Sequence, residues 1–211
     1  MSLKAVSLLS CSLCLAACSA VPQSATLSDT KMAPYQQVRL VLKQQDTSAF
    51  SYSSQSEMIA ARALGAMSPV SGIVSAAAGI RAATRGSEIQ KSLQLTDPAK
   101  GIEQALATRL QRQYGLDTQS NNPQTIELDV RTTQWRPVYQ LSTKRYSLDY
   151  QADMNLMQGE QQLSKGTCVY KTPAERQAIS FAMILANGAT WLKQETEQAI
   201  QHCDLTLIKS S

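Results

Sequence analysis

Alternation of apolar and polar residues is the clearest pattern along the chain. Between residues 145 and 156 every second residue is apolar, without a phase error. A period of two is typical of a strand with one buried and one solvated face. Shorter alternating runs occupy 35–43 and 126–131, and Gly159 turns the chain into a partner strand over about 161–171. These runs predict the strands of one sheet.

Helical spacing appears between the strands predicted at 35–43 and 126–131. Apolar residues recur every three or four positions between Asp97 and Gly115, at Ile102, Ala105, Leu106 and Leu110. Asp97 suits a helix N-cap, Pro98 suits the first turn, and Gly115 suits the exit. The pattern predicts a structural helix with one buried stripe.

The C-terminal region also predicts helices. Two helical runs cover 173–185 and 189–202, with an interruption at Asn187-Gly188, and 204–209 could return as a short edge strand. The whole order of elements predicts an α+β fold. We expect an antiparallel sheet of about four to five strands with helices packed on one face.

The segment 57–86 is rich in alanine, glycine and serine. Glycine recurs there every seven residues, at Gly65, Gly72, Gly79 and Gly86. Pro69 favours two helices, 57–67 and 70–84, in which the glycines form a seam of small side chains. The pattern resembles a glycine zipper, which implies self-association or membrane contact. Alternatively, the segment packs on the domain's own sheet without a further role, or is flexible. The functional and the structural interpretation both stay open.

The N-terminus follows a different plan. Lys4 precedes an apolar stretch of 13 residues over 5–17, shorter than the roughly 20 residues that a membrane-spanning helix needs. Leu15-Ala16-Ala17-Cys18 follows and resembles the lipobox of bacterial lipoproteins. The resemblance implies cleavage before Cys18 and acylation of its thiol. With Ser19 next in the chain, it also implies attachment to the Gram-negative outer membrane, facing the periplasm.

These features divide the chain into three parts. We expect a signal peptide over 1–17, a lipidated cysteine and flexible tether over 18–34, and one periplasmic domain over 35–211. The formal net charge is only +4, without a dense run of lysine and arginine. Nucleic acid is therefore not an expected partner.

Two further cysteines remain in the expected mature chain, Cys168 and Cys203. In an oxidising periplasm such a pair predicts a disulfide, which would stabilise the fold by roughly 3–4 kcal/mol. The rival interpretation is a reactive Cys203 beside His202, the sole histidine. Neighbouring residues on a helix point in directions about 100° apart, so this adjacency is weak support for a catalytic pair.

The sequence offers no recognisable catalytic site. It lacks a G-x-S-x-G elbow, a clustered glycine-rich phosphate loop and a set of zinc ligands, so we expect no cofactor and no metal. Paired carboxylates are the remaining option for catalysis. Four acids are expected on the solvated face of the sheet: Glu127, Asp129, Asp149 and Asp153. Nearby arginines make an ordinary solvated face the simpler interpretation.

An interaction surface is better supported. Trp135 and Tyr139 combine with arginines near a predicted hairpin tip, a composition favoured at binding hot spots. Alternatively, both aromatics cover the edge of the core. We therefore expect a non-enzymatic envelope lipoprotein, an accessory, assembly or interaction subunit that binds a protein partner or its own kind. A lipid or small-ligand carrier is the alternative, and an envelope hydrolase ranks third.

Overall fold

The computed structural model describes residues 25–27, 38–43, 50–52 and 85–210. The main sheet has the strand order β2-β3-β4-β5. Its strands are β2 (Arg39–Leu42), β3 (Thr125–Gln140), β4 (Arg145–Gln158) and β5 (Gln161–Lys171). Together with the helices below, this sheet confirms the predicted α+β fold.

The sheet is mixed, not antiparallel throughout. β3, β4 and β5 pair antiparallel, whereas β2 pairs parallel with β3, with Leu40 opposite Ile126. The difference from the prediction has a simple cause. The helix between β2 and β3 carries the chain back along the sheet, so that β3 starts beside the start of β2.

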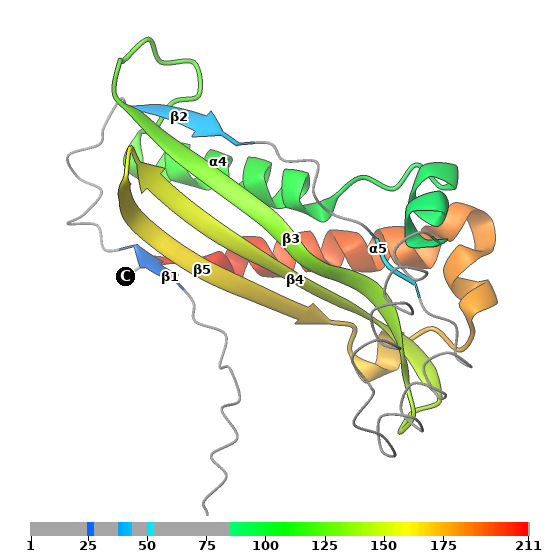
Figure 1. Ribbon diagram of the computed structural model, residues 1–211. Coiled ribbons are helices and arrows are strands. Elements are labelled where there is room, and N and C mark those ends of the chain that lie inside the picture. The colour runs from blue at the N-terminus through cyan, green and yellow to red at the C-terminus, as the bar shows by residue number, and fades with distance from the viewer. Residues whose placement is uncertain (1–24, 28–37, 44–49, 53–84, 211) are drawn as a thin grey trace, which may run out of the picture.

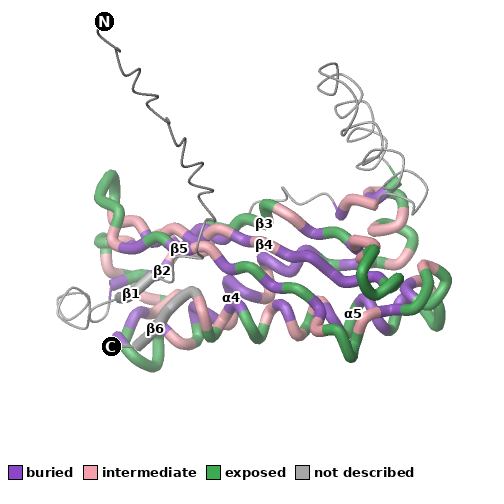
Figure 2. The backbone as a smooth tube through the Cα atoms, turned by 90° about the horizontal axis from the view of Figure 1, so that it is seen from below, coloured by how far each residue is buried: buried purple, intermediate pink, exposed green. Residues whose placement is uncertain are grey.

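Two long helices lie against one face of the sheet, α4 (Pro98–Tyr114) and α5 (Phe181–Leu207) (Figures 1 and 2). A shorter helix covers 85–92. The predicted capping of α4 is confirmed, because Asp97 Oδ1 accepts a hydrogen bond from Ala99 N at 2.9 Å and Gly115 ends the helix with a φ of 69°. Fully buried aliphatic side chains from both layers form the core, among them Leu40, Ile102, Leu106, Leu110, Ile126, Leu128, Leu156 and Leu192.

β3 is longer than predicted because a bulge corrects its phase. The register with β4 shifts between Thr132 and Gln134. The extra residue returns the next apolar side chain, Trp135, to the face that packs on the helices. The strand therefore continues to Gln140, beyond the run that alternates in the sequence.

The predicted helix over 173–185 is wrong in its first half. Only a single 3-10 turn, η2 (Ala174–Arg176), forms there, and α5 starts at Phe181. The backbone of Ala178 exchanges two hydrogen bonds with Tyr146 at the start of β4, which holds this stretch extended. The interruption predicted at Asn187-Gly188 is confirmed, since residues 186–189 depart from helical geometry.

The end of the chain also differs from the prediction. α5 continues to Leu207, and β6 (Ile208–Ser210) pairs parallel with β1 (Ala25–Leu27) in a separate two-stranded sheet, not at the edge of the main one. The predicted tether, 18–34, includes residues 25–27, but these form a strand beside the C-terminus (Figure 1). In the described part of the chain, no helix is sufficiently long and apolar to span a membrane.

Candidate functional site

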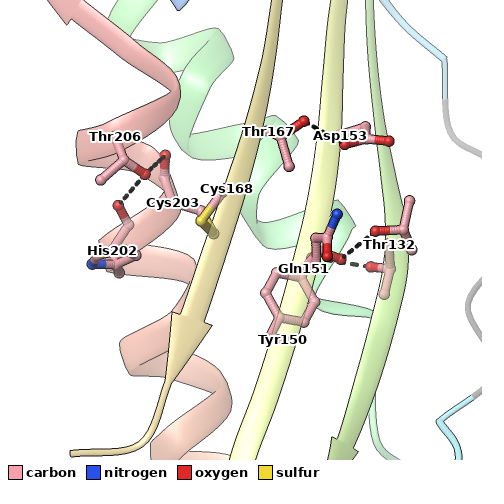
Figure 3. The surroundings of a disulfide bond; sticks show 10 residues. Thr132, Tyr150, Gln151, Asp153, Thr167, Cys168, His202, Cys203 and Thr206 are labelled. Carbon is pink, nitrogen blue, oxygen red and sulfur yellow. Dashed lines mark hydrogen bonds between the residues drawn. A yellow bond between two sulfur atoms is a disulfide. The ribbon is translucent and has the colours of Figure 1, made fainter. Parts of the chain in front are cut away.

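The predicted disulfide is confirmed. Cys168 on β5 and Cys203 on α5 are bonded, with their Cα atoms 5.4 Å apart (Figure 3). Both residues are buried. The bond occupies the thiol of Cys203, so the rival interpretation of a Cys203–His202 catalytic pair is wrong. The disulfide fixes the last helix, α5, to the sheet.

A partly buried ionic network fixes the same helix nearer its middle. Tyr170 on β5 donates a hydrogen bond to Glu195 Oε2 at 2.6 Å, and Arg176 donates to Glu195 Oε1 at 3.0 Å. Arg176 also donates to the Tyr170 hydroxyl at 2.8 Å. Burial, followed by the hydrogen bond to Glu195, raises the pKa of Tyr170 to about 12. A tyrosine so held stays protonated at neutral pH and serves to join β5 and α5.

The acids expected on the solvated face are less exposed than predicted. Of the four acids, Asp129 and Asp149 are buried, whereas Glu127 and Asp153 are partly exposed. Asp129 Oδ2 forms an ion pair with Arg131 Nη2 at 2.7 Å. Asp149 accepts from Ser147 Oγ at 2.8 Å. Each buried carboxylate thus has a partner on a neighbouring side chain, but its burial departs from the solvated face that the sequence predicts.

The two aromatic interaction candidates occupy different environments. Trp135 is only 1% exposed, and its ring meets Phe50 edge to face with centroids 5.1 Å apart. The core alternative thus describes Trp135 correctly, since a buried ring offers no surface to a protein partner. Tyr139 is half-buried and packs edge to face on Tyr146, with centroids 5.2 Å apart.

The β3–β4 hairpin tip lies at one end of the molecule (Figure 1), and exposed apolar side chains occur in its turn and in the segment 179–183, which follows the backbone bonds between Ala178 and Tyr146. Leu141 is 51% exposed, Ile179 is 67% exposed and Met183 is 43% exposed. Thr143 in the hairpin turn donates a 2.7 Å hydrogen bond to Gln177, which ties the turn to the segment before α5. We call Leu141, Ile179 and Met183 the apolar tip. Sequence patterns miss it, because its members come from separate loops.

Of the four repeated glycines, Gly86 is the one whose surroundings are described. It is buried, and a Cβ added there would lie 1.6 Å from the carbonyl oxygen of Phe50. Its lack of a side chain therefore serves packing within the chain. Gly65, Gly72 and Gly79 lie outside the described residues, so their predicted seam stays a prediction.

A cleft of about 400 Å³ lies between α4 and α5. Residues of the α4 N-terminal region, of β3 and of α5 line it: Gln94, Leu95, Thr96, Asp97, Lys100, Gly101, Gln104, Trp135, Lys193, Thr196, Glu197 and Ile200. A neighbouring hollow shares residues 94–97 and Lys100 and extends along the helix over 85–92. The cleft is a further candidate site, and no sequence motif predicts it.

Comparison with protein-family models, with curated proteins and with solved structures found no match. The described residues include no group of three or more His, Cys, Asp or Glu side chains that could hold a metal ion. Within the described ranges, the apolar tip and the cleft are two candidate surfaces.

Proposed function

We propose that the protein is a non-enzymatic accessory lipoprotein of the Gram-negative outer membrane that faces the periplasm and binds a partner protein through the apolar tip. Its lipobox-like residues end at Cys18, the proposed site of acylation. Several acyl chains at ~0.8 kcal/mol per buried CH₂ would make the anchor effectively permanent. The disulfide between Cys168 and Cys203 agrees with export to an oxidising compartment.

The position of β1 limits how far the fold can lie from the proposed anchor. Ala25 follows Cys18 by seven positions, a stretch that spans at most about 25 Å when fully extended. β1 pairs with β6, so the corner of the fold that holds the C-terminus stays within about that distance of the lipid. The anchored corner is the β1–β6 pair.

The apolar tip lies at the end remote from that corner. Met183 belongs to the first turn of α5, whereas β6 follows the last residue of the same helix. Its regular part, 190–207, is about 27 Å long at 1.5 Å per residue. A lipid at Cys18 would leave the apolar tip accessible to a partner in the periplasm.

The exposure of Leu141, Ile179 and Met183 is the single observation that carries this proposal. Isolated apolar side chains on a surface need no explanation, but a group at one end of an elongated molecule is typical of an interaction surface. Lys144 and Arg145 beside it add exposed positive charge and favour a partner with acidic residues around an apolar centre.

Photo-crosslinking in intact envelope tests the proposal. The crosslinker p-benzoylphenylalanine replaces Ile179 in one variant and Gln113, an exposed residue of α4, in a matched control. We expect a discrete adduct from position 179 and none from position 113, and its loss when Met183→Ser is added. An adduct of twice the chain's mass would identify a second copy as the partner. Equal adducts at both positions, or none at 179, would contradict the proposal.

A further inference from the structure

Three buried polar atoms that lack a hydrogen-bond partner among the described residues belong to side chains around one cleft. They are Oδ2 of Asp97, Nε1 of Trp135 and Oγ1 of Thr196. All three residues line the cleft between α4 and α5. Asp97 is 8% exposed and Trp135 is 1% exposed. Buried polar atoms are normally paired, because leaving one unpaired is costly, so this grouping points to a ligand.

The three atoms define what such a ligand must offer. A carboxylate oxygen of Asp97 accepts hydrogen bonds, the indole N–H of Trp135 only donates, and the hydroxyl of Thr196 does either. The ligand must therefore carry a donor for Asp97 and an acceptor for Trp135. A purely apolar molecule, or one that only accepts, would leave one of these groups unpaired.

The two most buried groups are held in place by their other contacts. Oδ1 of Asp97 accepts from Ala99 N at 2.9 Å and from the Thr132 hydroxyl at 2.7 Å, which fixes the carboxylate plane and the direction of Oδ2. The Trp135 ring is fixed by the edge-to-face contact with Phe50. Both groups therefore keep fixed positions in the wall of the cleft, and a ligand must displace the side chains that cover them in order to reach these atoms.

The other residues that line the cleft supply charges of both signs and an apolar surface. Lys100 and Lys193 are cations that suit a carboxylate, and Glu197 joins Asp97 as an anion that suits an ammonium group. Leu95 and Ile200, with the indole ring, supply apolar surface. A volume of about 400 Å³ is at the small end of ligand sites.

We propose that this cleft binds a small zwitterion with an apolar side chain, an apolar amino acid or a short apolar peptide. Its ammonium group would lie against Asp97 and Glu197, and its carboxylate against the Trp135 N–H and the two lysines. The inference goes beyond the proposed function and is independent of the apolar tip, since the two sites share no residue. Either proposal can therefore be refuted without affecting the other.

Binding is tested on the mature full-length protein in detergent by isothermal titration calorimetry. The probes are L-leucine, dileucine, leucinamide, which lacks the carboxylate, and 4-methylpentanoate, which lacks the ammonium group. We expect saturable binding of L-leucine or dileucine, and binding of leucinamide and 4-methylpentanoate weaker than that of leucine by roughly tenfold or more, because each leaves charged groups unpaired. If neither zwitterion binds saturably, the proposal is overturned.

Variants locate the binding. Asp97→Asn keeps a good N-cap residue but replaces an acceptor oxygen by a donor, so the preference for the zwitterion over 4-methylpentanoate should vanish. Thr196→Val should weaken binding, whereas Thr206→Val, on the same helix but outside the cleft, should not. A Trp191→Phe variant leaves Trp135 as the sole tryptophan and reports binding by its fluorescence. Binding that Asp97→Asn and Thr196→Val leave unchanged would refute the site.

Discussion

Glu103 on α4 gives the fold a pH dependence that can be measured directly. The side chain is 2% exposed, and its Oε1 has no hydrogen-bond partner in the described part of the chain. Burial, and then the negative charge of Asp129, raises the pKa of this carboxyl from 4.5 to about 7, against a smaller lowering effect of a hydrogen bond with the Lys43 backbone. The ionised form is therefore the unfavourable one in the folded protein.

The sign of the effect follows from the direction of the pKa change. Between pH 4.5 and 7 the folded protein keeps a proton on Glu103 that the unfolded chain has released, so stability falls as the pH rises through this window. The contribution is complete below pH 4.5 and lost above pH 7. At 1.36 kcal/mol per unit of pKa, this group removes about 2.5 kcal/mol of unfolding free energy between pH 5 and pH 8.

The substitution Glu103→Gln removes this titration. Urea unfolding at pH 5 and pH 8, without reductant, should give the unaltered protein a loss larger than that of the variant by about 2.5 kcal/mol. Glu127→Gln is the control, because Glu127 is about half exposed, pairs with Lys43 at 3.9 Å and should change the loss little. The reasoning is refuted if Glu103→Gln and the unaltered protein lose equal stability between the two pH values.

Further predictions concern the packing of the domain. Joint replacement of Cys168 and Cys203 by alanine should lower the unfolding free energy by about 4 kcal/mol, for a 35-residue separation, and unchanged urea midpoints would contradict this. Gly86→Ala should cost several kcal/mol and lower the Tm, because the added Cβ meets backbone; a normal Tm would refute the tight packing. Tyr170→Phe should cost about 1–3 kcal/mol by depriving Glu195 of a buried donor, and an unaffected urea midpoint would contradict it.

The local patterns of the sequence were sufficient for much of the fold. The alternation over 145–156 gave β4, and the spacing between Asp97 and Gly115 gave α4 with both its caps. Both elements bury one continuous face, so the period of the apolar residues reports the element directly. The cysteine count and the expected compartment were sufficient for the disulfide.

Features set by distant parts of the chain were not predictable in this way. Residues 177–180 have helical composition, but the backbone bonds between Ala178 and Tyr146 hold them extended. The parallel pairing of β2 depends on where α4 returns the chain. The break in phase at Trp135 is compatible in the sequence with either a bulge or the end of the strand, and only the pairing with β4 shows that it is a bulge.

The cleft illustrates the same limit for sites. Asp97, Trp135 and Thr196 belong to three elements and are separated by tens of residues, so no spacing rule connects them. Asp97 was correctly predicted as a helix cap from its local sequence. That prediction explains one carboxylate oxygen, and the unpaired second oxygen becomes visible only when the other two elements pack beside it.

Mass spectrometry of the mature protein, purified from a Gram-negative host without reductant, tests the central claim most directly. We expect a chain that begins at Cys18, carries covalently bound acyl chains, and gains the mass of two hydrogens when the Cys168–Cys203 bond is reduced. A chain that retains residues 1–17, or one that begins at Cys18 with an unmodified thiol, would contradict it.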